Sequence, residues 1–159
     1  PYVSVVGDSA AAILAGELGS QRDSRFRLLC QRESTLKEGE RRGIRTRLLS
    51  EVGQHGDQDV LVLLDGALEV PSFVQLLRPR GRLVLARPPR ISADFSSLFR
   101  QQLTVLPSAA SPVRSGLDAL IKGTLRADGL AERVLTLDEV SQWWQQPRAR
   151  TLVRIGANR

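Results

Sequence analysis

The sequence has 159 residues, 42% hydrophobic and 25% charged, which is typical of one globular domain large enough to bury a core. The net charge is +6, but the arginines are scattered and aromatic residues make up only 4%, so no nucleic-acid partner is expected. One cysteine, Cys30, and one histidine, His55, exclude an internal disulfide and are too few for a zinc site, so no metal is expected.

The sequence contains no apolar run long enough to span a bilayer and no recognisable signal peptide, so no membrane partner is expected. The single cysteine fits a reducing compartment, and we expect a cytoplasmic protein. The chain begins at Pro1 and contains no methionine, which indicates a piece of a longer chain.

The first stretch of the chain predicts a strand, a tight turn and a helix. The β-branched run Tyr2–Val6 ends at Gly7, and small residues follow at helical spacing from Ala10. This is the form of the first βα unit of a nucleotide-binding sheet, whose helix N-terminus faces an anion such as a pyrophosphate. The G-x-G-x-x-G spacing of such turns here reads Gly7, Ser9 and Ala12.

The residues of this turn have different expected roles. Gly7 makes the turn, and Ala12 is small enough for close packing of helix against strand. Ser9 either donates its hydroxyl to a phosphate or only caps the helix, with Asp8 as a rival N-cap. Asp8 also places a negative charge near the expected phosphates. All four are candidate cofactor contacts, and phosphate binding is left open.

The second strand is expected at Phe26–Cys30, near the distance at which a dinucleotide fold places its ribose-binding residue. A carboxylate there would bind the ribose hydroxyls of NAD, but the chain continues with Gln31 and Arg32. Loss of the acid beside an arginine is the pattern of NADP, whose 2′-phosphate suits a guanidinium. Gln31 and Arg32 are therefore candidate ribose contacts, and NADP is favoured over NAD. The alternative is that Arg32 is a solvated loop residue.

The remaining chain alternates strands with helices, which predicts an α/β fold. We expect a doubly wound, mostly parallel Rossmann-like sheet in three layers. Further strands are expected at 44–49, 59–64, 82–86, 103–106, 134–135 and 151–155, and helices at 33–42, 68–77, 91–102, 112–125 and 137–146.

Two residues lie where ligand contacts are expected in such a sheet, just beyond the carboxyl ends of strands. Asp65 follows the apolar run 59–64, and either faces a cofactor or caps the next helix. Ala86 ends the strand 82–86 and is the second candidate on the nicotinamide side. Three local signals complete the prediction: Ser34 as N-cap with Gly43 as C′ residue, an inward face of Phe95, Leu98 and Phe99, and a capping box of Thr136 with Glu139.

The order of these elements resembles the cofactor-binding half of the medium-chain dehydrogenase/reductase superfamily, in particular its quinone oxidoreductase and enoyl reductase branch. The resemblance covers nearly the whole chain. It rests on the segments VVGDSAAAILAGELG, DVLVLLDGA, SFVQLLRPRGRLVLA, LTVLPSAAS and LDALIKGTLRADGLAERVLTLDEVSQWW.

The resemblance implies one Rossmann-like nucleotide-binding domain over residues 1–159, cut from a multidomain chain. That domain would hold NADP(H) for hydride transfer to a carbonyl or activated alkene bound by a substrate-binding domain of the same parent chain. The family's last strand pairs within that other domain, so the strand 151–155 is expected to extend this sheet or to pair with a segment outside the chain.

Two alternatives stand beside this reading. The first is a catalytically inactive Rossmann-like structural module of a multidomain synthase, which Asp8, Ser9 and Cys30 favour because they depart from the family pattern. The second is a class I methyltransferase-like domain. The second strand counts against it, because it lacks an acid that would bind the ribose of S-adenosylmethionine. No general acid or nucleophile stands out, so the catalytic residues and the substrate are not predicted.

Overall fold

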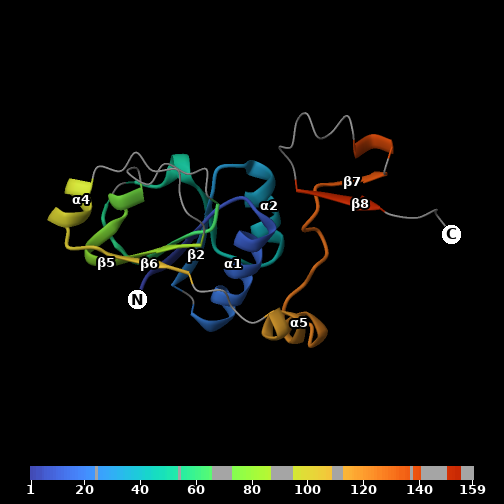
Figure 1. The fold of residues 1–159 in the computed structure, drawn as a ribbon, viewed down its shortest axis with the longest axis horizontal. Coiled ribbons are helices and arrows are strands. Elements are labelled where there is room, and N and C mark those ends of the chain that lie inside the picture. The colour runs from blue at the N-terminus through green and yellow to red at the C-terminus, as the bar shows by residue number, and fades with distance from the viewer. Residues whose placement is uncertain are drawn as a thin grey trace. The chain divides into compact units, whose positions relative to one another are not determined.

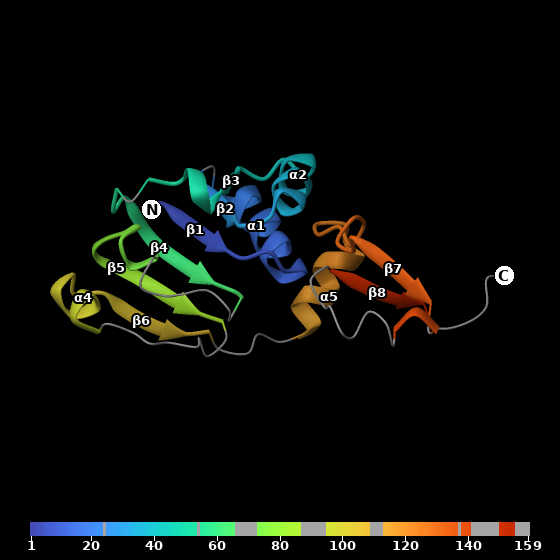
Figure 2. The same ribbon diagram turned by 90° about the horizontal axis from the view of Figure 1, so that it is seen from above.

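The computed structural model describes residues 1–23, 25–53, 55–65, 73–86, 95–108, 113–136, 138–140 and 150–154. The chain divides into two compact units, Pro1–Arg126 and Ala127–Arg159. Figure 1 and Figure 2 together show the labelled elements of each unit. Among the described residues, no helix is both long and apolar enough to cross a membrane.

A six-stranded parallel sheet forms the centre of the first unit. Its strands follow the order β3-β2-β1-β4-β5-β6, so the chain reverses direction across the sheet between β1 and β4. Figure 2 shows the arrowheads of β1, β4 and β6 pointing the same way. The strands are β1 (Val3–Val6), β2 (Phe26–Cys30), β3 (Thr46–Leu48), β4 (Gln58–Leu63), β5 (Leu77–Leu85) and β6 (Thr104–Pro107).

Helices lie on both faces of this sheet, because right-handed crossovers on either side of β1 place their helices on opposite faces. The predicted doubly wound, three-layered α/β fold is therefore confirmed. The helices of the first unit are α1 (Ala10–Arg22), α2 (Glu33–Arg41), the 3-10 turn η1 (Leu49–Glu51), α4 (Phe95–Arg100) and α5 (Val113–Ile121).

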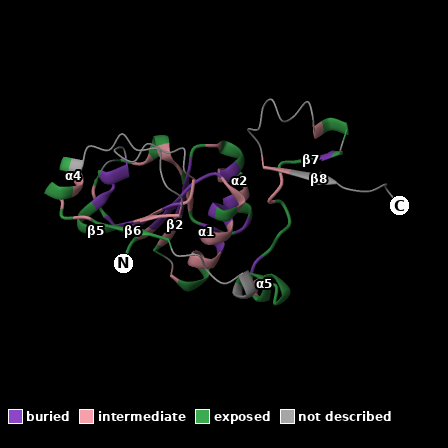
Figure 3. Cartoon of the chain, viewed as in Figure 1, coloured by how far each residue is buried: buried purple, intermediate pink, exposed green. Residues whose placement is uncertain are grey.

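Successive residues of β2 show the two faces of the core. Leu28 points to the side of α1, where Gly16 brings the helix backbone close to its side chain. Leu29 points to the opposite side and belongs to a buried apolar cluster, against which Leu98 of α4 packs. Figure 3 shows buried segments in the sheet and in α1, and the buried strand residues lie mainly in β1, β2 and β4. That cluster consists of Val6, Leu29, Leu61, Leu63, Phe73, Val74, Leu76, Leu77 and Leu83.

The start of β5 differs from the prediction. The strand begins at Leu77 rather than at Arg82, and its register with β4 shifts between Gln58 and Val60. Pro79 lies within this irregularity, where its missing N–H does not break a regular ladder. The predicted helix 68–77 falls mostly outside the described residues.

Two local predictions on the helices are wrong. Arg32, not Ser34, is the N-cap of α2, and the Arg32 side chain makes no capping hydrogen bond to that helix. Phe99 is 87% exposed rather than inward, whereas Leu98 packs against the buried apolar cluster as predicted. The side chain of Phe95 lies outside the described residues. The C′ prediction is confirmed, since Gly43 has a φ of 73° just after α2.

The second unit contains a two-stranded parallel sheet of β7 (Arg133–Thr136) and β8 (Thr151–Arg154). The last strand therefore pairs with β7, rather than extending the large sheet or pairing with a segment outside the chain, which corrects the expectation for 151–155. One of the two bonds of the predicted capping box is confirmed: the side chain of Glu139 reaches back to Thr136, and its Oε2 accepts from the N–H of Thr136 at 2.8 Å. The two tryptophans of the predicted helix 137–146 lie outside the described residues.

Candidate functional site

The predicted site residues meet at the carboxyl edge of the sheet, where β1 and β4 lie side by side and the topology switches. Gly7 follows β1, Asp65 lies two residues beyond β4, and Gln31 follows β2. Ala86 lies just after β5, and its N–H donates to Leu63 O at 2.9 Å. In open parallel sheets, this crevice is where ligands bind.

Gly7 allows a close approach that no other residue would allow. Its φ is 155°, and a Cβ built there would lie 2.8 Å from Asp65 Oδ2 and 3.0 Å from the Cβ of Ala12. A side chain at Gly7 or a larger one at Ala12 would therefore displace α1 or Asp65. The small residues of the predicted turn are needed for its packing.

The turn already holds an anion, the carboxylate of Asp65. Asp65 Oδ2 accepts hydrogen bonds from the backbone N–H of Asp8 and, at 3.1 Å, from that of Ser9. These are N–H groups of the turn that was predicted to receive a pyrophosphate. This arrangement is neither of the two alternatives predicted for Asp65, because its carboxylate turns back onto the glycine turn.

Ser9 is the N-cap of α1. Its φ of −76° and ψ of 163° are extended, and its Oγ accepts from the N–H of Ala12 at 3.3 Å. Of the two predicted N-cap candidates, Ser9 therefore fills the role and Asp8 does not.

The side chain of Asp8 reaches the end of β2 instead. Its carboxylate accepts from the N–H of Gln31 at 3.1 Å and from that of Arg32 at 3.0 Å. The Arg32 guanidinium donates through Nη2 to the carbonyl oxygen of Asp8 at 2.9 Å, and its Nε lies 3.7 Å from Asp8 Oδ1. Asp8 is only 9% exposed. The acid that the sequence lacks at the end of β2 is thus supplied from the first turn.

Strand register explains this contact, which the sequence analysis missed. Val6 pairs with Leu29 in parallel register, so the residues that follow each strand lie next to each other. The available signal was the pairing of the first two strands, which places Asp8 beside Gln31 although they are 23 residues apart.

The charges at this edge do not suit a phosphate. The predicted site residues carry two carboxylates, Asp8 and Asp65, and one guanidinium, which already contacts Asp8. Two unit charges of like sign about 4 Å apart repel by about 4 kcal/mol at an effective dielectric constant of about 20. Because two carboxylates lie at this turn, its residues in this arrangement do not fit the phosphates of a dinucleotide.

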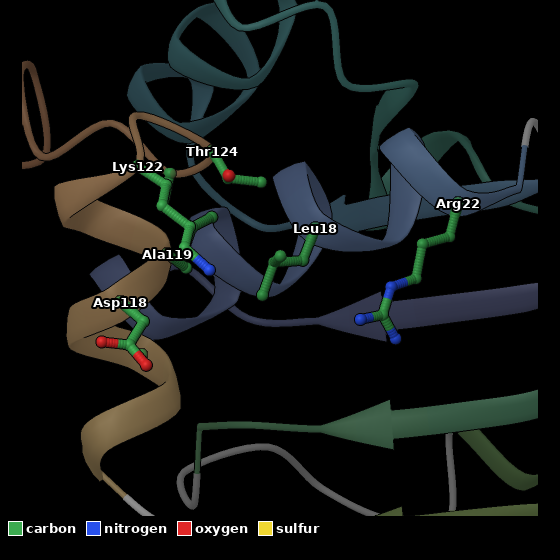
Figure 4. Close-up of a pocket in the computed structure, with 8 residues that line it drawn as sticks. Leu18, Arg22, Asp118, Ala119, Lys122 and Thr124 are labelled. Atoms are coloured by element: carbon green, nitrogen blue, oxygen red, sulfur yellow. The ribbon is translucent and has the colours of Figure 1, made fainter.

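A pocket of about 560 Å³ lies elsewhere in the first unit, between α1 and α5. It contains none of the predicted site residues, and its side chains do not form a catalytic set. Figure 4 shows the labelled lining residues Leu18, Arg22, Asp118, Ala119, Lys122 and Thr124.

The described residues contain no group of three His, Cys, Asp or Glu side chains that could hold a metal ion. Cys30 is a buried thiol whose Sγ lies 3.5 Å from the carbonyl oxygen of Arg47. His55 is exposed.

No protein-family model matches the chain, and no curated protein matches it. Solved structures do. L-idonate 5-dehydrogenase from Escherichia coli gives a TM-score of 0.76 at 14% identity over 96% of this chain and 49% of that one. A thermostable alcohol dehydrogenase from Pyrobaculum aerophilum gives 0.74 at 18% over 96% and 50%. A short chain alcohol dehydrogenase from Escherichia coli, complexed with NADH, gives 0.67 at 13% over 95% and 50%.

These neighbours are named as dehydrogenases, and the chain spans about half the length of each. At such identities the likeness shows the fold alone. The predicted resemblance to half of a dehydrogenase is therefore confirmed for the fold, while the quinone oxidoreductase and enoyl reductase branch stays a prediction. The chain has a Rossmann-like, nucleotide-binding type of fold that occurs in dehydrogenases.

Proposed function

We propose that this chain is a Rossmann-like structural module whose dinucleotide site is closed by its own carboxylates, and that it serves as a scaffold within a longer multidomain enzyme. The observation that carries the proposal is the pair of hydrogen bonds from the Asp8 and Ser9 N–H groups to Asp65 Oδ2. A pyrophosphate would need those donors.

Displacing Asp65 is costly for an incoming ligand. A hydrogen bond to a charged group contributes roughly 1.5–3 kcal/mol, and Asp65 accepts two of them from the turn. Because the carboxylate belongs to the same chain, it competes at an effective concentration far above that of a free cofactor. A displaced Asp65 would also stay close enough to repel the phosphates. These arguments support a module that does not use a dinucleotide.

The second candidate is the one that the sequence predicts first, an NADP(H)-binding domain of a quinone or enoyl reductase-like protein. The sheet order and the switch point favour it, and one structural neighbour is named as a complex with NADH. The substrate would then be held by another domain of the same parent chain. The contacts of Arg32 with Asp8 count against a free guanidinium for a 2′-phosphate.

A thermal-shift titration separates the two candidates. The intact chain is titrated to millimolar concentration with NADH, NADPH and S-adenosylmethionine, the last of which tests the methyltransferase-like alternative. A ligand present at about 100 times its Kd stabilises the folded state by about 2.7 kcal/mol, which a melting curve resolves easily. The structural module predicts no saturable rise in Tm with any of the three.

A saturable rise would overturn the proposal. A rise with NADPH that Arg32→Ala abolishes would instead support the reductase domain and a phosphate contact for that arginine. A rise with S-adenosylmethionine alone would support the methyltransferase-like domain.

A further inference from the structure

We infer that, among the described residues, Asp65 is the side chain that occupies the phosphate-binding part of the dinucleotide site, and that the site opened at this position takes NAD(H) in preference to NADP(H). The inference rests on the proposed function, because it explains how the module is kept closed. It assigns an autoinhibitory role to Asp65 and a selective role to Asp8.

The space for a ligand group above the turn exists, and Asp65 fills it. Gly7 has no side chain, and both Oδ2 and Cγ of Asp65 lie within 2.9 Å of the position that a Cβ of Gly7 would take. The carboxylate therefore lies directly over the glycine. Ala12 beneath it is fully buried and fixed by packing, and Ser9 caps the helix. A shorter side chain at position 65 would leave this space and the two N–H donors open.

The sheet itself holds Asp65 in place. The N–H of Leu64 donates to Val6 O at 3.1 Å, and the N–H of Gly7 donates to Leu29 O at 3.0 Å. These bonds continue the strand pairing to the residues that flank the turn. Asp65 is thus presented to the turn from a fixed backbone, which makes it an effective internal competitor of a phosphate.

The ribose end of the site carries its own selection. The nearly buried carboxylate of Asp8 is held by the N–H groups of Gln31 and Arg32. A carboxylate accepts hydrogen bonds from the two hydroxyls of an unmodified ribose, whereas it repels a 2′-phosphate. The guanidinium of Arg32 is oriented toward Asp8, so it does not offset that repulsion for a phosphate.

The test uses the intact chain and measures the Kd of NADH and NADPH by calorimetry and NADH fluorescence. Asp65→Ser shortens the side chain and removes its charge. Asp118→Ser is the matched control, because it removes an exposed carboxylate of α5 far along the sequence from the turn. Circular dichroism and Tm establish that each variant is folded. Asp65→Ala, which also shortens the side chain and removes the acceptor oxygens, is the second variant in case the serine destabilises the turn.

We expect Asp65→Ser to bind NADH at least ten times more tightly than the unmodified chain, and NADPH at least ten times more weakly than NADH. Asp118→Ser should behave like the unmodified chain. Adding Asp8→Ser to Asp65→Ser should remove the preference for NADH, because the carboxylate that binds the ribose hydroxyls and repels the 2′-phosphate is then absent.

Other outcomes overturn the inference. If a folded Asp65→Ser and a folded Asp65→Ala bind neither nucleotide, Asp65 is not the closing group, although the structural-module proposal stands. If the unmodified chain already binds NADH and Asp65→Ser leaves the Kd unchanged, both proposals fail. If Asp118→Ser gains the same affinity for NADH, the effect of Asp65→Ser comes from the change in net charge alone. A preference of Asp65→Ser for NADPH over NADH would refute the role of Asp8.

Discussion

Arg42, one residue beyond α2, is a cation with no exposed side-chain surface. Its Nη1 donates to Glu17 Oε2 at 2.7 Å and to the carbonyl oxygen of Arg126 at 2.8 Å, and its Nε donates to Glu38 Oε1 at 2.6 Å. Glu17 of α1 is itself only 5% exposed in its side chain, so the two buried charges depend on each other for their solvation. This network ties α1 to the end of α2 and to the end of the first unit.

Replacing Arg42 by methionine should destabilise the protein by roughly 3–5 kcal/mol, because Glu17 would keep a buried charge without its principal partner. The measurement is urea unfolding followed by circular dichroism. Arg41→Met is the matched control. Arg41 bonds the same Glu38 and is the largest cause that holds the pKa of Glu38 below its usual value of 4.5. Its own side chain is 48% exposed. Its removal should cost at most about 1 kcal/mol. Equal losses in the two variants would contradict the importance of burial.

The distinction between a buried and an exposed position also decides how whole elements pack, because glycines set how closely a helix approaches a strand. In α1, a Cβ at Gly19 would overlap the aromatic ring of Phe26 in β2. In α5, a Cβ at Gly116 meets nothing within 4 Å. The two glycines look alike in the sequence, since both interrupt an apolar helical pattern, but only the first brings elements together.

Alanine at these two positions should therefore change stability in opposite directions. Gly116→Ala should stabilise the protein by about 0.5–1 kcal/mol through helix propensity, because no contact opposes it. Gly19→Ala gains the same propensity but must push the ring of Phe26 away, and overpacking of this kind costs about 1–3 kcal/mol. We expect a net loss of stability for Gly19→Ala, measured as a shift of the urea midpoint at constant slope. A gain at both positions would show that α1 can move away from β2 freely.

The sequence predicts an element well where the pattern that determines it is local, and poorly where it depends on residues far apart in the chain. The apolar runs of β1, β2 and β4 are local and contiguous, so those strands are found within one or two residues of the prediction. The exposure of Phe99 depends on where α4 lies over the sheet, which no local pattern contains. The turn residues Gly7 and Ala12 follow from spacing alone. The bonds of Asp8 with Asp65 and with Arg32 join residues 57 and 24 positions apart, and they become visible only with the strand order.

At the scale of the whole molecule, the two units differ in what can stabilise each alone. The first unit contains the six-stranded sheet, the buried apolar cluster, the Asp65 turn and the Arg42 network. The second contains the β7–β8 pair, and Leu135 is the buried apolar residue among its described positions. Chains below about 40 residues rarely bury enough apolar surface to fold without a metal, a disulfide or a partner.

We therefore expect residues 1–126 to fold alone and residues 127–159 to be unfolded alone, as measured by amide dispersion in NMR spectra and by thermal melts.

The end of the first fragment matters because Arg126 is part of the buried network. Its carbonyl oxygen accepts from Arg42, and its Nε donates to Glu17 Oε1 at 3.1 Å. A fragment that ends at residue 121 loses both bonds and also lacks Leu125, which is buried in the intact chain. It should melt several degrees below the fragment 1–126, since each kilocalorie lost lowers Tm by roughly 2–8 °C in domains of this size. If both fragments melt together, the last residues of the unit do not stabilise it. If 127–159 folds unaided, its two strands form a far more stable pair than isolated two-stranded sheets usually do.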